Sequence, residues 1–385
     1  MATANNQKLP ILDAFRFIAA VLVVLVHYEL VFGKFVIYGA FATTAVSWFF
    51  VVSGFILSYT YPTLESKAEL TRFYLHRVIR IYPVYALAVI TSVIFVVWGY
   101  GNLGEEFFSA VNRPEPLIHD LPDNKGVRFW IGATWRHLVF AQSLNPIETL
   151  KFLFNGPLWS LVLEMYFYLA FPLLLLLIRP INSLTRVVGA LVGGYVVQFA
   201  LIQLNLPDAE ILDITNLNVP VYTNPLIRGF EFLFGMLLYK AFVITSSNTE
   251  SRFLKPVPSG IAILAYVAVI HFASVYTPYQ YHAFFIELPF VVAMVYALLK
   301  MDWYPGQRAV RICTVLGGMS YVLYCFHWPV MEITRYSELL APSLPYPMHI
   351  TLLIVGLLLF SYLIYRFVES PIRGLLYRVI KYRVG

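Results

Sequence analysis

Residues 169–178 read LAFPLLLLLI, and this stretch decides the fold class of the 385-residue chain. A strand of a membrane β-barrel alternates apolar with polar residues, and this uninterrupted apolar run does not alternate. With the residues before it, the apolar stretch extends over 156–178, which is long enough for a helix that crosses a bilayer. The stretch therefore predicts an all-α membrane protein.

The composition of the whole chain supports this interpretation. Hydrophobic residues make up 59% of the chain and charged residues 12%, whereas a soluble domain has about 45–50% apolar and about 25% charged residues. These values exclude an ordinary soluble enzyme, a disordered chain, a collagen-like fibre and a disulfide scaffold. Cys313 and Cys325 lie about 18 Å apart along one predicted helix, which is too far for a disulfide bond. The sequence contains no zinc-binding spacing, so we expect no metal.

Ten segments are long and apolar enough to be predicted as membrane-spanning helices. They are residues 11–31, 42–61, 83–99, 156–178, 187–204, 226–245, 260–276, 283–299, 313–333 and 349–367. Residues 129–145 are aromatic but contain Arg136, His137 and Gln142, which predicts an interfacial or re-entrant helix. The expected fold is a polytopic bundle of about ten transmembrane helices.

The basic residues predict how the chain is oriented. With a cytoplasmic N-terminus, most of the 27 lysine and arginine residues fall on the cytoplasmic side, as the positive-inside rule requires. Both termini are then cytoplasmic, and the net charge of +6 needs no nucleic acid to explain it. We expect an integral membrane domain over residues 1–375 and a basic cytoplasmic tail over 376–385. The outer segments 100–155 and 205–225 form either a platform for an acceptor or simple connecting loops.

The first predicted span carries two ionisable side chains on one face. Arg16 and His27 are eleven residues apart, which corresponds to about three full helical turns and a rise of about 16 Å. Ionisable groups inside a span are costly unless they face a cavity or a partner, so they are candidates for function. The alternative is an arginine that reaches the membrane surface and a histidine that is hydrogen-bonded in the core.

The fourth span places a carboxylate at a depth similar to that of His27. Glu164 follows Trp159 and Ser160, and a buried carboxylate requires a cationic or hydrogen-bonding partner. A carboxylate that holds one imidazole nitrogen leaves the other nitrogen free to act as a general base. The alternative partner for Glu164 is Arg228, which opens the sixth span.

Arginine residues gather on the predicted cytoplasmic side. Arg77 and Arg80 share a helix face, and Arg373 lies on the same side of the membrane. Paired guanidinium groups bind phosphate, so these residues predict a bound anion. The alternative is contact with lipid phosphates.

The ninth span contains Ser320, Tyr324 and His327 on one helical face, followed by Pro329. Pro329 frees a backbone carbonyl within the helix. The three side chains form either a structural hydrogen-bond ladder or part of a ligand site. In the second span, Ser53 and Gly54 form a small-residue notch that close helix packing explains.

These segments, taken in order, resemble acyltransferase family 3, the membrane O-acyltransferases that modify bacterial surface glycans. The shared signatures are Arg16 followed after ten residues by His27, FFVVSGF at 49–55, RVIRIYP at 77–83, WSLVLEMYFY at 159–168, SYVLYCFHWP at 320–329 and ESP at 369–371. The resemblance covers residues 10–375. The chain departs from the usual family pattern at Ala14 and Phe15, and at Ser370.

The resemblance implies a cytoplasmic acyl-coenzyme A donor, with acetyl-coenzyme A as the expected molecule. Arg77, Arg80 and Arg373 would hold its phosphates, and Arg16 would contact its pantetheine or pyrophosphate. His27 is then expected to act as the general base on the acceptor hydroxyl.

The resemblance also implies an acceptor at the outer face, either a glycan or a lipid-linked sugar. Glu164 would orient His27 or help to position this acceptor, and the remaining candidates for substrate contact are Trp159, Ser160, Arg228, Tyr324 and His327. The expected location is the bacterial inner membrane, and we expect a stand-alone transferase without a fused hydrolase-like domain.

Two functions from other classes remain open at this point. A proton-coupled secondary transporter of a small polar or anionic solute also uses buried arginine, histidine and glutamate side chains. It predicts inverted repeats, which the sequence does not show. A structural membrane protein would not need ionisable groups aligned at two depths.

Overall fold

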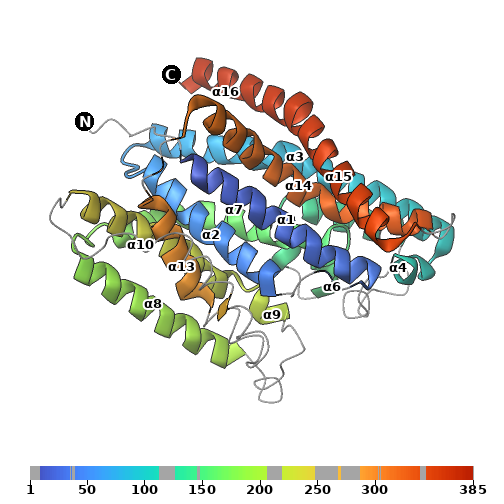
Figure 1. Ribbon diagram of the computed structural model, residues 1–385, viewed down its shortest axis with the longest axis horizontal. Coiled ribbons are helices and arrows are strands. Elements are labelled where there is room, and N and C mark those ends of the chain that lie inside the picture. Colours follow the sequence, from blue (N-terminus) through green and yellow to red (C-terminus); the bar gives the residue numbers. More distant parts are fainter. Residues whose placement is uncertain are drawn as a thin grey trace. The chain divides into compact units, whose positions relative to one another are not determined.

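A computed structural model of the protein describes residues 9–34, 36, 40–111, 126–144, 148–205, 219–247, 268–269, 287–301, 303, 305–338 and 344–384. Every element in these ranges is helical, and none of the described residues lies in a strand (Figure 1). The all-α prediction is therefore confirmed for the described part of the chain.

The longer helices are α1 (Pro10–Phe32), α2 (Ala40–Thr60), α3 (Lys67–Leu103), α5 (Val127–Leu138), α7 (Trp159–Ile178), α8 (Leu184–Asn205), α10 (Pro225–Ser247), α13 (Glu287–Leu299), α14 (Gln307–Glu338), α15 (Tyr346–Ile364) and α16 (Ser370–Val384). The short elements are α4 (Glu106–Ala110), η2 (Gln142–Leu144), α6 (Glu148–Phe152), η3 (Gly156–Leu158), α9 (Val219–Tyr222) and the π-helical segment η7 (Tyr365–Glu369).

Among the described residues, seven helices are long and apolar enough to cross a membrane by length and composition. They are Pro10–Phe32, Phe41–Thr60, Lys67–Leu103, Gly156–Ile178, Leu184–Asn205, Gln307–Glu338 and Tyr346–Ile380. Each coincides with a predicted span, so a multi-pass membrane protein is supported. The number ten and the orientation of the termini stay predictions.

Three further predicted spans have different outcomes. Helix α10 occupies the predicted span 226–245 but is not among the seven, and its sequence includes Arg228, Glu231 and Lys240. Helix α13 is apolar and covers residues 287–299 of the predicted span 283–299, and residues 283–286 lie outside the described residues. The predicted span 260–276 lies outside the described residues except for 268–269.

Two other predicted segments are single helices in the structure. Residues 129–145 were expected to form an interfacial or re-entrant helix, and the structure has the 12-residue helix α5 there, which is too short to be a candidate span. The predicted basic tail over 376–385 is, as far as Val384, the second half of α16.

The chain divides into two compact units, each described by itself. Unit 1 comprises residues 1–19, 38–66 and 166–317, and unit 2 comprises 20–37, 67–165 and 318–385. In unit 1, α2 packs against α10 and α13, and α10 also packs against α8. In unit 2, α3 packs against α4, α5 and α16.

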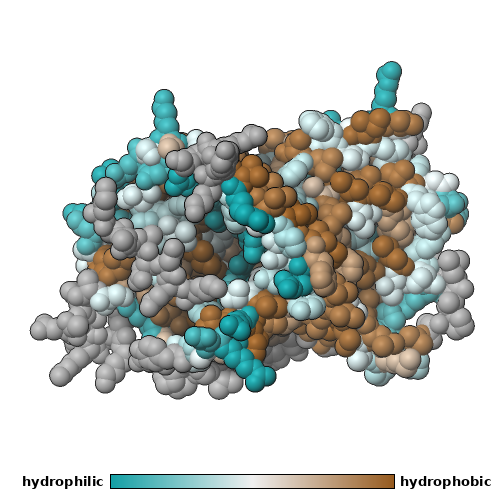
Figure 2. Space-filling view, turned by 90° about the horizontal axis from the view of Figure 1, so that it is seen from above, coloured by the Kyte–Doolittle hydropathy of each residue, from teal (hydrophilic) through white to brown (hydrophobic). Residues whose placement is uncertain are grey.

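Apolar side chains remain exposed along several helices at helical spacing. Examples are Leu169, Leu173 and Leu176 on α7, Val188, Val192 and Val196 on α8, and Leu352, Val355 and Leu359 on α15. Figure 2 shows apolar residues over much of the right-hand part of the face that it displays. An exposed apolar surface of this kind is expected where lipid takes the place of water.

The notch at Gly54 is a point of close helix packing, as the sequence predicted. A Cβ atom added at Gly54 in α2 would overlap the backbone carbonyl of Phe232 in α10, and one added at Gly235 in α10 would overlap the carbonyl of Val51 in α2. The two glycines therefore let the α2 and α10 backbones approach each other directly.

We expect Gly54→Ala to destabilise the protein by about 1–3 kcal/mol, because the added methyl group forces α2 and α10 apart. The matched control is Gly193→Ala in α8, where an added Cβ meets no atom within 4 Å. Thermal unfolding of both variants in detergent measures the difference. Equal midpoints for the two variants would contradict the proposed packing role.

Candidate functional site

The predicted general base, His27, lies against a second histidine in unit 2. The Nδ1 atom of His27 in α1 is 2.8 Å from the Nε2 atom of His327 in α14. Their rings stack with centroids 5.0 Å apart, and the indole of Trp328 meets His27 edge-on at 5.3 Å. His327 is buried and His27 is partly buried.

The hydrogen-bond partners define the tautomers of both neutral rings. The Nδ1 atom of His327 is 2.8 Å from the backbone carbonyl of Tyr324, and a carbonyl only accepts, so this nitrogen carries the hydrogen. The Nε2 atom of His327 is then an acceptor, and His27 donates its Nδ1–H to it. The lone pair of His27 therefore lies on Nε2, which is the form that a general base requires.

A hydroxyl pair lies beside the histidines. The Ser160 and Tyr324 hydroxyls are 2.6 Å apart, and Tyr324 also donates to the carbonyl of Pro157 at 2.9 Å. The Tyr324 ring is 5.7 Å from the His327 ring. The turn η3 positions Ser160 because it ends where α7 begins. His27, Ser160 and the pair Tyr324 and His327, which the sequence indicated on three different predicted spans, thus gather in one place, here called the histidine cluster.

Pro329, which lies inside α14, determines a further contact in this region. Proline has no N–H, so the carbonyl of Cys325, four residues earlier, loses its helical donor. Asn155 replaces that donor, with its Nδ2 atom 2.9 Å from the Cys325 carbonyl oxygen and 3.4 Å from the Ser92 hydroxyl. Asn155 is fully buried. The sequence indicated the freed carbonyl but not its partner, because Asn155 is 170 residues away along the chain.

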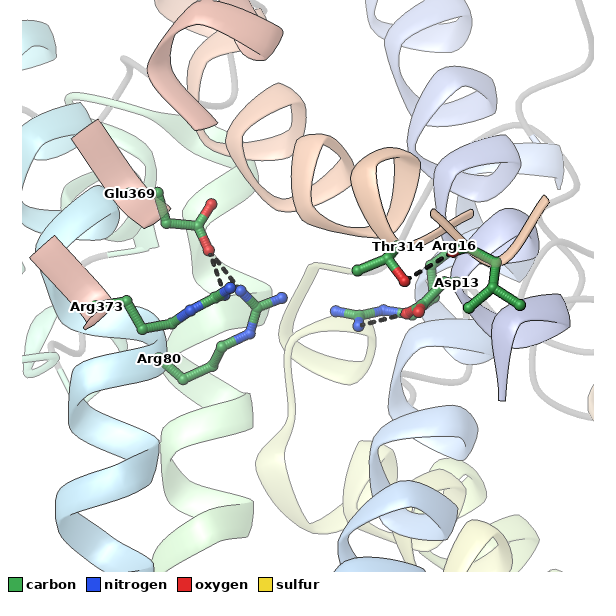
Figure 3. A network of polar contacts seen from close by, with 7 residues as sticks. Asp13, Arg16, Arg80, Thr314, Glu369 and Arg373 are labelled. Atoms are coloured by element: carbon green, nitrogen blue, oxygen red, sulfur yellow. Dashed lines mark hydrogen bonds and ion pairs between the residues drawn. The ribbon is translucent and has the colours of Figure 1, made fainter. Parts of the chain in front are cut away.

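The predicted anion site is built around a carboxylate. Arg80 in α3 and Arg373 in α16 both donate to the Oε1 atom of Glu369, at 2.5 Å and 2.9 Å (Figure 3). Glu369 ends the π-helical segment η7 and is buried. The Arg80 guanidinium also lies over the Tyr321 ring, 5.4 Å from its centroid. We call Arg80, Glu369 and Arg373 the arginine cluster, and its formal charge is +1.

Helix α14 carries Tyr324 and His327 of the histidine cluster and also contacts the arginine cluster through Tyr321. Arg80 contacts Tyr321, and His327 follows six residues later, which is a rise of about 9 Å along the helix. The two clusters therefore lie at different levels along α14.

The other predicted residues have contacts of their own. Arg77 is half-buried one turn before Arg80, and Glu164 lies within electrostatic range of Cys325 in α14. Trp159 is buried at the start of α7. The roles predicted for these three residues stay predictions, including the contact of Glu164 with His27.

Two predicted residues belong to unit 1. Arg16 is paired with Asp13 at 4.0 Å, which Figure 3 also shows. Arg228 is fully buried and is paired with Glu231 at 3.1 Å. The predicted roles of Arg16 in donor binding and of Arg228 in acceptor binding stay predictions. No group of histidine, cysteine and acidic residues that could hold a metal ion occurs among the described residues.

The fold and the two clusters fit a membrane-bound transferase, and comparison with known proteins identifies the family. The family model described as "Acyltransferase domain" matches residues 9–366. The chain therefore belongs to this acyltransferase family, as the sequence motifs indicated. No solved structure matches the fold significantly.

Two curated proteins illustrate the relationship. Over 96% of its length, the chain is 24% identical to "Peptidoglycan O-acetyltransferase OatA" of Listeria monocytogenes, of which it covers 56%. Over 99% of its length, it is 25% identical to "Putative peptidoglycan O-acetyltransferase YrhL" of Bacillus subtilis, of which it covers 57%. The chain thus spans little more than half the length of these relatives.

We expect Asn155→Ala to destabilise the protein by about 1–3 kcal/mol, because it leaves the buried Cys325 carbonyl without a donor. In a Pro329→Ala background the helix regains its own N–H, so removal of Asn155 should cost less. Thermal unfolding of the two single variants and the double variant gives this coupling. Strictly additive effects would show that Asn155 does not serve the carbonyl freed by Pro329.

Proposed function

We propose that this protein is a membrane O-acyltransferase that moves an acyl group from acyl-coenzyme A to a sugar hydroxyl. Acetyl is the first candidate for the acyl group. The observation that carries the proposal is the His27–His327 pair, which leaves the Nε2 atom of His27 as a base. Family membership supports the acyl transfer, and the names of the relatives support acetyl as the group.

The arginine cluster is the proposed place for the donor phosphates. Arg80 and Arg373 carry one positive charge more than Glu369 neutralises, so an anion is attracted to them. Arg77 adds a further cation on the same helix, one turn away. The thioester would then lie beside His27, at the level of α14 where His327 lies.

The proposed transfer is direct. His27 takes the hydroxyl proton of the acceptor at Nε2, and the acceptor oxygen attacks the thioester carbonyl carbon. The carbon–sulfur bond breaks, and the departing thiolate takes the proton from His27. The reaction therefore forms one ester and one thiol without net uptake or release of protons.

The acceptor is proposed to be a peptidoglycan sugar or another extracytoplasmic glycan, in a bacterial cytoplasmic membrane. The names of the relatives support peptidoglycan as the first candidate. Because His327 holds the Nδ1 atom of His27, we assign Glu164 to acceptor positioning, together with Ser160 and Tyr324.

The direct test is release of free coenzyme A thiol from acetyl-coenzyme A by the purified protein in nanodiscs. We expect release that depends on an added glycan, and labelled acetyl groups on that glycan. Donor turnover that is absent with every glycan pool, together with proton-coupled solute uptake in vesicles, would instead establish the transporter alternative.

We expect His27→Ala to lower turnover by about 10²–10⁴-fold, the usual contribution of a general base. His327→Phe should lower kcat while the donor KM stays unchanged, because His27 loses the acceptor that orients it. His327→Gln, whose amide oxygen accepts a hydrogen bond, should retain more activity than His327→Phe. Equal loss in both His327 variants would contradict the orienting role.

We expect Arg80→Gln and Arg373→Gln to raise the donor KM by about 10–100-fold each, because each removes a charge-assisted hydrogen bond of about 1.5–3 kcal/mol. The matched control is Arg378→Gln, an exposed arginine on α16 that donates to a carbonyl of its own helix. Steady-state kinetics with varied acetyl-coenzyme A separates KM from kcat. A donor KM that rises equally in all three variants would show general surface charge rather than a site.

A further inference from the structure

Unit 1 contains a second group of ionisable side chains, which the proposed transfer does not use. Arg228 and Glu231 on α10 and Glu287 at the start of α13 are all fully buried. They lie among helices that pack directly on one another, since α2, α10 and α13 are in mutual contact. We call these three residues the carboxyl cluster.

The contacts of the carboxyl cluster are specific. Arg228 is paired with the Oε1 atom of Glu231 at 3.1 Å, and the Ser47 hydroxyl donates to the same oxygen at 3.3 Å. The Thr44 hydroxyl donates to the Oε2 atom of Glu287. Glu287 also interacts electrostatically with Arg228.

Aromatic rings enclose the single cation. The Arg228 guanidinium lies over the Phe50 ring at 5.2 Å and over the Tyr222 ring at 5.1 Å. Such rings stabilise a cation and separate it from solvent. Arg228 thus remains charged and is the local counter-ion for both carboxyl groups.

The charges of the carboxyl cluster do not balance if both acids are ionised. One guanidinium then faces two carboxylates, and an uncompensated charge in an apolar interior is costly. Among the described residues, the Oε1 atom of Glu287 and the Oε2 atom of Glu231 are buried and have no hydrogen-bond partner. These two oxygen atoms are therefore available to bind one additional positive charge.

We propose that Glu287 binds an exchangeable proton, so that unit 1 carries a proton-binding site separate from the histidine cluster. Glu231 is the ionised partner of Arg228, because the 3.1 Å ion pair is between these two. Glu287 interacts electrostatically with Arg228, but its direct hydrogen-bond partner is the Thr44 hydroxyl. Glu287 is therefore the residue that takes the proton.

Among the described residues, the polar groups around Glu287 and its neighbour Arg228 come from each element packed against them. They are Thr44 and Ser47 from α2, Arg228 and Glu231 from α10, and Tyr222 from α9. Arg228 is the one cation among them. Loss of the Glu287 proton places a second carboxylate beside this single cation and weakens the attachment of α13 to α2 and α10. Acyl transfer from a thioester to a hydroxyl is proton-neutral, so the site is independent of the transfer step.

The test is chemical labelling of the full-length protein in lipid nanodiscs, with no donor or acceptor present. Dicyclohexylcarbodiimide reacts with protonated carboxyl groups in apolar surroundings, and peptide mass spectrometry locates the adduct. We expect an adduct at Glu287 that decreases as the pH is raised and is lost in Glu287→Gln. Glu338→Gln is the control, since Glu338 is paired with Arg335 and His349 in unit 2 and its loss should leave the adduct unchanged.

Infrared spectroscopy tests the same proposal without relying on one variant. The wild-type protein should show the C=O stretch of a protonated acid, and Glu287→Asp should shift this band. Absence of both the adduct and the acid band overturns the proposal.

Discussion

Hydrocarbon offers no hydrogen bonds, so the polar groups on membrane helices must find partners inside the protein. This constraint is most visible in the middle of α14. Pro329 removes the donor of the Cys325 carbonyl, and Asn155 supplies another. The neighbouring Tyr324 carbonyl accepts from His327, and that bond defines which nitrogen of His27 is basic. The orientation of the two histidines thus follows from the hydrogen bond to the Tyr324 carbonyl, next to a carbonyl that Asn155 satisfies.

The sequence predicted much of this arrangement, because ionisable residues inside apolar segments are easy to recognise. Helical spacing placed Tyr324 and His327 on one face, and the structure adds Ser160 and His27 to them. What the spacing could not predict is contact between helices far apart in the chain. The partner of His27 is His327, which is 300 positions away along the chain. No local sequence pattern favours His327 over Glu164 as that partner.

The arginine cluster shows the same limit for charges. Basic residues on the predicted cytoplasmic side indicated an anion site, but the sequence indicated Glu369 only as part of the ESP motif at 369–371. The structure shows that Glu369 holds Arg80 and Arg373 on a single oxygen atom. A carboxylate between two guanidinium groups keeps them close together before any ligand binds. The remaining positive charge still favours the binding of a phosphate group. Such preorganisation reduces the cost of ordering long side chains on binding.

The choice of histidine rather than a carboxylate as the partner of His27 has a chemical consequence. In a serine-protease triad, an aspartate stabilises the imidazolium that forms during catalysis. His327 is a neutral acceptor, because its own Nδ1–H is committed to a carbonyl. A neutral partner avoids a buried negative charge in the resting protein, but it stabilises an imidazolium less. In the proposed transfer, the positive charge on His27 is therefore short-lived, which favours prompt passage of the proton to the departing thiolate over a long-lived charged intermediate.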